Sequence, residues 1–164
     1  MEIIGLLLGI IFAIGLTLGV GSSTFALTNF IVALQDGVID DSEKRLMKVV
    51  YVILRIGMGL LAFGLIVPIL LYGIEIVDTQ YLMAILLLVI ITVNAILMTK
   101  RTMPMQYGPV LAGGSWYSLF LLTELPFYGV ALPVLAFYYV AFVVVFYFVF
   151  EAIKKKYLPQ KPIA

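Results

Sequence analysis

The sequence predicts an all-α fold, a polytopic bundle of about five transmembrane helices with the N-terminus outside and the C-terminus in the cytoplasm. Two observations predict the bundle. The 164 residues are 64% hydrophobic and 12% charged, whereas soluble domains are about 45–50% apolar and about 25% charged. The chain also contains several charge-free runs near or above the length of about 20 residues that crosses a bilayer. A third observation, the placement of the basic residues, predicts the orientation.

The five apolar runs are the expected spans. We place them at about residues 3–34, 42–74, 79–99, 109–125 and 127–150. The first run is longer than one crossing needs, and the second begins early. We therefore expect a helical hairpin that extends past the membrane on the cytoplasmic side, with its tip near residues 35–42 and its turn at Asp36 and Gly37. Residues 1–153 form a single domain, and residues 154–164 form a basic cytoplasmic tail.

Charged residues give the orientation of these spans. With five spans, every Lys and Arg falls on one side of the membrane, and the opposite side receives only Glu2, Glu75, Asp78 and Glu124. The positive-inside rule places the basic side in the cytoplasm of a prokaryotic cell membrane. A four-span alternative makes segment 109–125 re-entrant, but it would place the basic C-terminal segment outside, against this rule.

Small residues recur along the first helix in two rows with a spacing of four. One row contains Gly5, Gly9, Ala13, Thr17 and Gly21, and the other contains Gly15, Gly19 and Ser23. Small residues let membrane helices approach each other closely, so both rows predict helix packing. The alternative is a polar lining for a conduction path, but such paths usually carry an ionisable group at depth, and this helix has none.

Polar residues are scarce within the remaining spans. Asn94 lies deep in the third run, and Ser115 and Tyr117 lie in the fourth. A buried amide needs hydrogen-bond partners, so Asn94 is expected to join two helices. The same three residues are the candidates for an intramembrane polar site.

Basic residues line one face of the segment that opens the second helix. Asp40, with Glu43 three positions later, predicts a capped helix start. Lys44, Lys48 and Arg55 then lie opposite an apolar face. These three are candidates for binding anionic lipid headgroups, with Arg55 at the inner membrane interface. A plain solvated face is the alternative.

The residue types limit the chemistry. The chain has no Cys and no His, and we predict no cofactor, no catalytic residues and no enzyme activity. Met98, Met103 and Met105 are weak candidates for a copper site, because thioethers suit Cu(I). The net charge of +1 predicts no nucleic-acid partner.

Several short motifs resemble those of a known group. They are the run GVGSST at residues 19–24, Asp36 and Gly37 with Glu43, Asn94, and the run SWY at residues 115–117. In these the chain resembles small uncharacterised prokaryotic membrane proteins, distantly similar to the copper-resistance D-like integral membrane group. The resemblance implies a helical membrane fold. Relatives often carry His, which this chain lacks, so it implies no haem or copper activity.

Three functions follow as hypotheses. A small chain with packing rows, no charged path and an aromatic-rich last span is typical of an accessory or structural subunit of a membrane complex. The alternatives are a small oligomeric transporter or channel, and a copper-associated membrane protein. The expected partners are membrane lipid and either another membrane protein or further copies of this chain.

Overall fold

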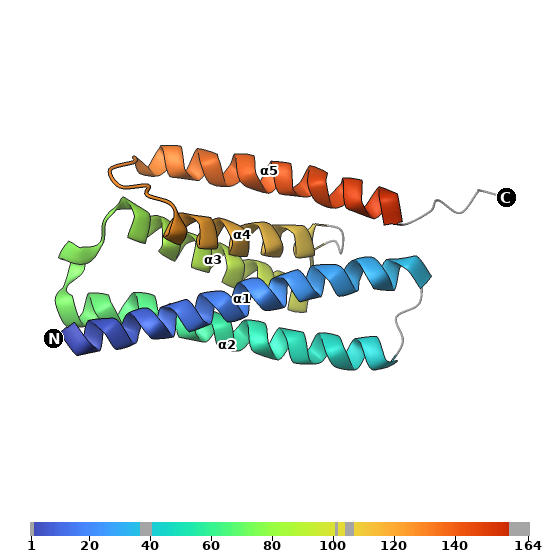
Figure 1. The fold of residues 1–164 in the computed structure, drawn as a ribbon, viewed down its shortest axis with the longest axis horizontal. Coiled ribbons are helices and arrows are strands. Elements are labelled where there is room, and N and C mark those ends of the chain that lie inside the picture. Colours follow the sequence, from blue (N-terminus) through green and yellow to red (C-terminus); the bar gives the residue numbers. More distant parts are fainter. Residues whose placement is uncertain (1, 37–40, 101, 104–106, 158–164) are drawn as a thin grey trace.

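A computed structural model describes the chain over residues 2–36, 41–100, 102–103 and 107–157. The fold is all-α, as predicted. Its elements, in chain order, are α1 (Glu2–Asp36), α2 (Asp41–Tyr72), the short 3-10 helix η1 (Ile74–Ile76), α3 (Thr79–Thr99), α4 (Gly108–Glu124) and α5 (Leu132–Tyr157). The helices run along one common long axis, and α1 and α2 form an antiparallel pair along one side (Figure 1).

Helix α4 lies at the centre of the bundle. It packs against α1, α3 and α5 (Figure 1), and more than half of its 17 residues are buried. Trp116 and Leu119 of α4 meet Leu61 of α2 and Leu87 of α3 in the largest apolar cluster. The core is thus built around the shortest of the five α-helices.

Four helices, α1, α2, α3 and α5, are long and apolar enough to cross a membrane. At 1.5 Å per residue α4 is about 25 Å long, somewhat shorter than the hydrocarbon core of about 30 Å. Large apolar side chains cover the outside of the bundle, and Leu70 and Phe137 are 76% and 70% exposed. Such a surface is unusual for a protein in water and suits contact with lipid.

Helices α1 and α2 are the longest, with 35 and 32 residues. Their lengths of about 52 and 48 Å exceed the thickness of a bilayer. The tip that joins them, with Gly37 and the expected cap Asp40, lies outside the described residues.

The last helix differs from the expected boundaries at both ends. It begins at Leu132 rather than near residue 127. Pro126 precedes it, and Gly129 has φ +74, a conformation that side-chain-bearing residues rarely adopt. Helix α5 also continues to Tyr157, so that Lys154, Lys155 and Lys156 form its last turn rather than the start of a tail. Residues 158–164 lie outside the described chain.

Charge separates the two ends of the bundle. The chain's start, η1, the end of α4 and the start of α5 share one end (Figure 1), which we call the acidic end because it carries Glu2, Glu75, Asp78 and Glu124. The start of α2 and the ends of α3 and α5 share the other, basic end. No Lys or Arg of the described segments lies at the acidic end.

Candidate functional site

The second small-residue row of α1 faces the interior. A Cβ added at Gly15 would come within 2.9 Å of the Leu60 Cβ and the Leu61 nitrogen on α2. A Cβ added at Gly19 would come within 1.9 Å of the Trp116 ring. Ser23, also in this row, is buried. This row therefore provides the close approach of α1 to α2 and α4.

The first small-residue row of α1 faces outward. Its members Gly5, Gly9, Ala13, Thr17 and Gly21 are all exposed. A Cβ added at Gly9 or Gly21 would meet no atom within 4 Å, and the Thr17 hydroxyl donates to the Ala13 carbonyl of its own helix at 2.8 Å. A Cβ added at Gly5 would lie 3.7 Å from the Tyr72 hydroxyl of α2, an ordinary van der Waals distance, so the glycines of this row are not tightly packed against the described helices.

Asn94 joins α3 to the start of α4. The side chain is 2% exposed, and its Nδ2 donates to the Gly108 carbonyl at 3.0 Å. The Met98 sulfur lies 3.8 Å from the same nitrogen. The Asn94 Oδ1 is buried and has no hydrogen-bond partner among the described residues. The amide is thus half satisfied.

Ser115 joins α4 to α5. Its side chain is fully buried, and its Oγ donates to the Leu111 carbonyl at 2.7 Å. The Tyr139 hydroxyl lies 2.9 Å from the same Oγ. A serine hydroxyl has one hydrogen to donate, so Tyr139 is the donor of this second bond.

Tyr117 joins α4 to α1. Its hydroxyl lies 2.7 Å from the Thr24 Oγ1, which itself donates to the Val20 carbonyl, so that Tyr117 donates to Thr24. The Tyr117 ring packs against Phe146 of α5 with centroids 5.6 Å apart. Asn94, Ser115 and Tyr117 therefore make three separate contacts, and each attaches α4 to a different neighbour.

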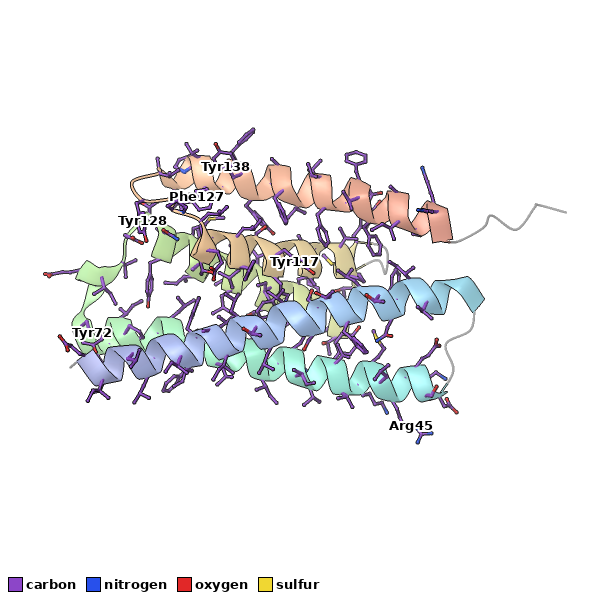
Figure 2. The ribbon with its side chains drawn as sticks, viewed as in Figure 1. Arg45, Tyr72, Tyr117, Phe127, Tyr128 and Tyr138 are labelled. Carbon is purple, nitrogen blue, oxygen red and sulfur yellow. The ribbon has the colours of Figure 1, made fainter. Side chains whose placement is uncertain are left out.

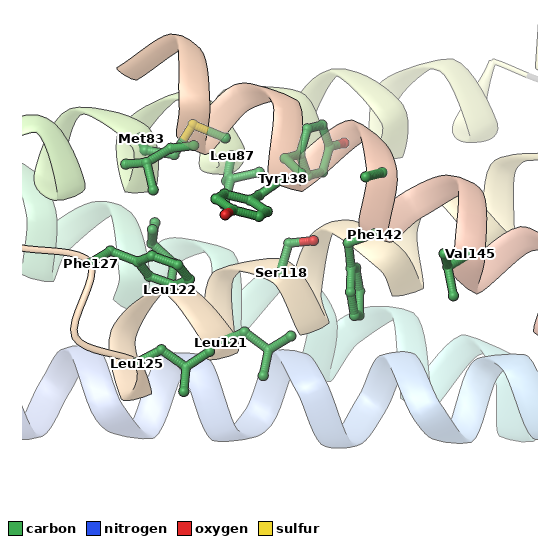
Figure 3. Close-up of a pocket in the computed structure, with 13 residues that line it drawn as sticks. Met83, Leu87, Ser118, Leu121, Leu122, Leu125, Phe127, Tyr138, Phe142 and Val145 are labelled. Carbon is green, nitrogen blue, oxygen red and sulfur yellow. The ribbon is translucent and has the colours of Figure 1, made fainter. Parts of the chain in front are cut away.

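A largely apolar pocket of about 500 Å³ lies between α3, α4 and α5 (Figure 3). Aromatic rings form much of its wall, and the Ser118 side chain points into it from α4, between Tyr138 and Phe142. Ser118 is 8% exposed, and its Oγ has no hydrogen-bond partner in the described part of the chain. The sequence analysis did not select Ser118, because nothing in its spacing separates it from Ser115.

A second groove, of about 410 Å³, runs between α1, α2 and α3 at the acidic end. Its polar groups already serve the fold. The Asp78 carboxylate caps α3 by accepting from the Tyr81 nitrogen at 2.7 Å, and the Gln80 side chain donates to the Leu122 carbonyl. Gly5 and Gly9 of the outward row form its edge.

The lipid-headgroup candidates lie on the surface of α2, with Lys44 and Lys48 near its start at the basic end and Arg55 nearer the middle of the helix. Lys44, Lys48 and Arg55 are exposed, and Arg45 also projects away from the helix (Figure 2). Lys44 pairs with Asp41 at 3.0 Å, an exposed contact that contributes little to stability.

The structure describes two of the three copper candidates, Met98 and Met103. The Met98 sulfur faces Asn94, Met103 lies beyond the end of α3, and Met105 is outside the described residues. No group of three or more Asp or Glu side chains that could hold a metal occurs within the described ranges.

Comparisons of the chain with protein-family models, curated proteins and solved structures give no match. Fold and contacts therefore define only a class. This class is an all-α bundle with four helices apolar enough to span a membrane, arranged around a buried α4. The resemblance to the copper-resistance D-like group stays a prediction.

Proposed function

We propose that this chain is a multi-pass protein of a prokaryotic cytoplasmic membrane that serves as an accessory subunit of a larger membrane complex. It crosses the bilayer five times, with the acidic end outside and the basic end in the cytoplasm. The single observation that carries the accessory role is the outward-facing row of small residues on α1.

The separation of charge supports the orientation. The described basic side chains other than Arg55 lie on the α2 start, the α3 end and the α5 end, which share one end of the bundle. The positive-inside rule places such an end in the cytoplasm. Lys44, Lys48 and Arg55 then face the anionic headgroups of the inner leaflet.

The surroundings of α4 support its role as a membrane span in addition to α1, α2, α3 and α5. The helix begins beside Met98, near the end of α3, and ends at Glu124 beside the acidic end. It forms hydrogen bonds with residues of α1, α3 and α5 and is buried among these longer helices. A re-entrant segment would return to the end where it began.

Labelling of single cysteines tests this topology, because the chain has no native Cys. Lys155→Cys and Glu75→Cys place thiols at exposed positions near opposite ends. We expect a membrane-impermeant maleimide to label intact cells at position 75 and to label position 155 only after permeabilisation. Labelling of position 155 in intact cells would overturn the five-span topology.

The outward row of α1 supports a partner within the membrane. The row GxxxGxxxAxxxTxxxG is a pattern through which membrane helices approach closely, and all of its residues are exposed in the described part of this chain. The inward row on the same helix is filled by α2 and Trp116. A helix with two packing rows and one occupied row fits a chain that docks a partner helix.

Site-specific crosslinking in the native membrane tests the accessory role. Thr17→Cys places a thiol in the outward row, and Val93→Cys on the exposed side of α3 is the control. We expect a crosslink from position 17 to a second membrane protein and none from position 93. A crosslink between two copies would instead support the homo-oligomeric transporter or channel, and the absence of any crosslink from position 17 would reject the docking row.

One observation favours the transporter alternative: the buried Asn94 Oδ1 has no hydrogen-bond partner among the described residues. If ions or polar solutes reach it, Asn94→Leu abolishes transport by the chain reconstituted in vesicles. Unchanged transport by the variant would remove this residue from any path. Ser115 and Tyr117 are weaker candidates for such a path, since their hydroxyls already form hydrogen bonds to neighbouring helices.

A further inference from the structure

We propose that the pocket between α3, α4 and α5 binds a neutral, lipid-soluble carbonyl compound with a flat ring, of the quinone class, and that Ser118 donates a hydrogen bond to its carbonyl oxygen. The inference needs the membrane placement of the chain, and it is independent of the accessory role. Four observations carry it.

The first observation is the orientation of Ser118. Other helical hydroxyls in this bundle donate to the carbonyl four residues earlier, namely those of Thr17, Thr24, Thr28, Thr92, Thr99 and Ser115. The Ser118 side chain is buried, at 8% exposure, and its hydroxyl has no partner in the described chain. A buried polar group without a partner needs an explanation, and a ligand acceptor in the pocket provides one.

The second observation is the shape and chemistry of the walls. The pocket of about 500 Å³ lies within the range of about 300–1,000 Å³ typical of small-molecule sites, which combine apolar walls with few polar groups. Phe127, Tyr138, Tyr139 and Phe142 line it. Aromatic rings stack on flat π-systems, so these walls favour a planar ring over a flexible chain.

The third observation is charge. The pocket lies toward the acidic end, where Glu124 ends α4 and Asp78 begins α3. No described Lys or Arg lies at that end, so nothing there would neutralise the phosphate of an anionic lipid. A neutral ligand avoids this repulsion.

The fourth observation is the route of entry. Leu125, Tyr138 and Val145 line the pocket and are 45%, 55% and 59% exposed. These residues form an open side between α4 and α5 on the lateral surface of the bundle. In the proposed topology this side faces lipid, so a molecule dissolved in the bilayer enters without passing through water.

The native fluorescence of Trp116 provides the test, because it is the single tryptophan of the chain and lies two positions before Ser118 on α4. Decylubiquinone is added to the purified chain in phosphatidylcholine nanodiscs, and quenching is followed. We expect saturable quenching in the wild type and a dissociation constant about three- to tenfold higher in Ser118→Ala, the effect of one hydrogen bond. Ser22→Ala is the matched control, since Ser22 is 9% exposed and does not line the pocket.

Ala141→Phe fills the pocket from α5 and should abolish the saturable component while the unfolding temperature stays near that of the wild type. If Ala141→Phe fails to fold, the Ser118→Ala and Ser22→Ala pair decides alone. Equal affinities in wild type, Ser118→Ala and Ser22→Ala would overturn the proposal. A second outcome would also overturn it. If phosphatidylcholine with brominated acyl chains quenches Trp116 and the added quinone then causes no further quenching, the occupant of the pocket is an acyl chain.

Discussion

The indole of Trp116 lies against Gly19, so that a Cβ built on this glycine would come within 1.9 Å of the ring. The ring is 1% exposed and is held in the largest apolar cluster, which leaves it little room to move. Gly19→Ala should therefore destabilise the chain by about 1–3 kcal/mol, the usual cost of an overpacked core. Unfolding in mixed micelles measures the change.

Gly21 of the same helix is the control for this substitution. A Cβ there meets no atom within 4 Å, and alanine is favoured over glycine in a helix by about 1 kcal/mol. Gly21→Ala should leave stability unchanged or raise it. Equal destabilisation by the two substitutions would show that Trp116 does not pack on Gly19.

The Ser115–Tyr139 bond should couple α4 to α5. A double-mutant cycle with Ser115→Ala and Tyr139→Phe isolates the pair, and hydrogen bonds between membrane helices contribute about 0.6 kcal/mol on average and up to about 1.7 kcal/mol. We expect a value in the upper half of this range, because Ser115 is fully buried. Tyr138→Phe is the control, since Tyr138 is 55% exposed, and a coupling energy near zero for Ser115 and Tyr139 would contradict the contact.

Asn94 offers a contrast between two substitutions of similar size. Asn94→Leu loses one hydrogen bond to Gly108 but also removes the unpartnered Oδ1, so stability should change by less than about 1 kcal/mol. Asn94→Asp would bury a carboxyl group without a donor and should cost about 2.5 kcal/mol or more. Equal unfolding free energies for the two variants would show that the Asn94 site is open to water.

Gly113 should tolerate a methyl group, unlike Gly19. A Cβ at Gly113 would come within 2.6 Å of the Leu27 Cδ1, at the flexible end of that side chain, and within 3.1 Å of the Phe146 ring. Gly113→Ala should cost about 1 kcal/mol or less, and Leu27→Val in the same chain should recover the loss, since it shortens the opposing side chain. A larger cost that Leu27→Val does not relieve would place the strain in the backbone.

Helix boundaries could be predicted from the sequence where charge or turn residues mark them. Helix α3 covers Thr79–Thr99, the range taken from its charge-free run. The start of α5 could not be found in this way, because residues 125–131 carry no charge and look continuous with the helix by hydropathy. Pro126 and the positive φ of Gly129 interrupt the helix there.

The inward and outward rows of α1 could not be told apart from the sequence. Helix α1 is apolar on all sides, because lipid and protein neighbours both accept apolar side chains. Periodicity therefore identifies both rows but not which one meets Trp116. The polar residues show the same limit, since the sequence does not say that Ser115 faces α5, that Tyr117 faces α1 or that Asn94 of α3 faces the start of α4.

The central place of α4 has a consequence for hydrophobic matching. A lipid-facing helix shorter than the hydrocarbon core must thin the bilayer around it, which costs fractions of a kcal/mol per Å. Helices α1, α3 and α5 surround α4, so in the proposed membrane placement the bilayer adapts to their lengths and not to that of α4. The length of α4 is set by the protein interior, and this helix could gain or lose a turn without altering the membrane thickness that the chain prefers.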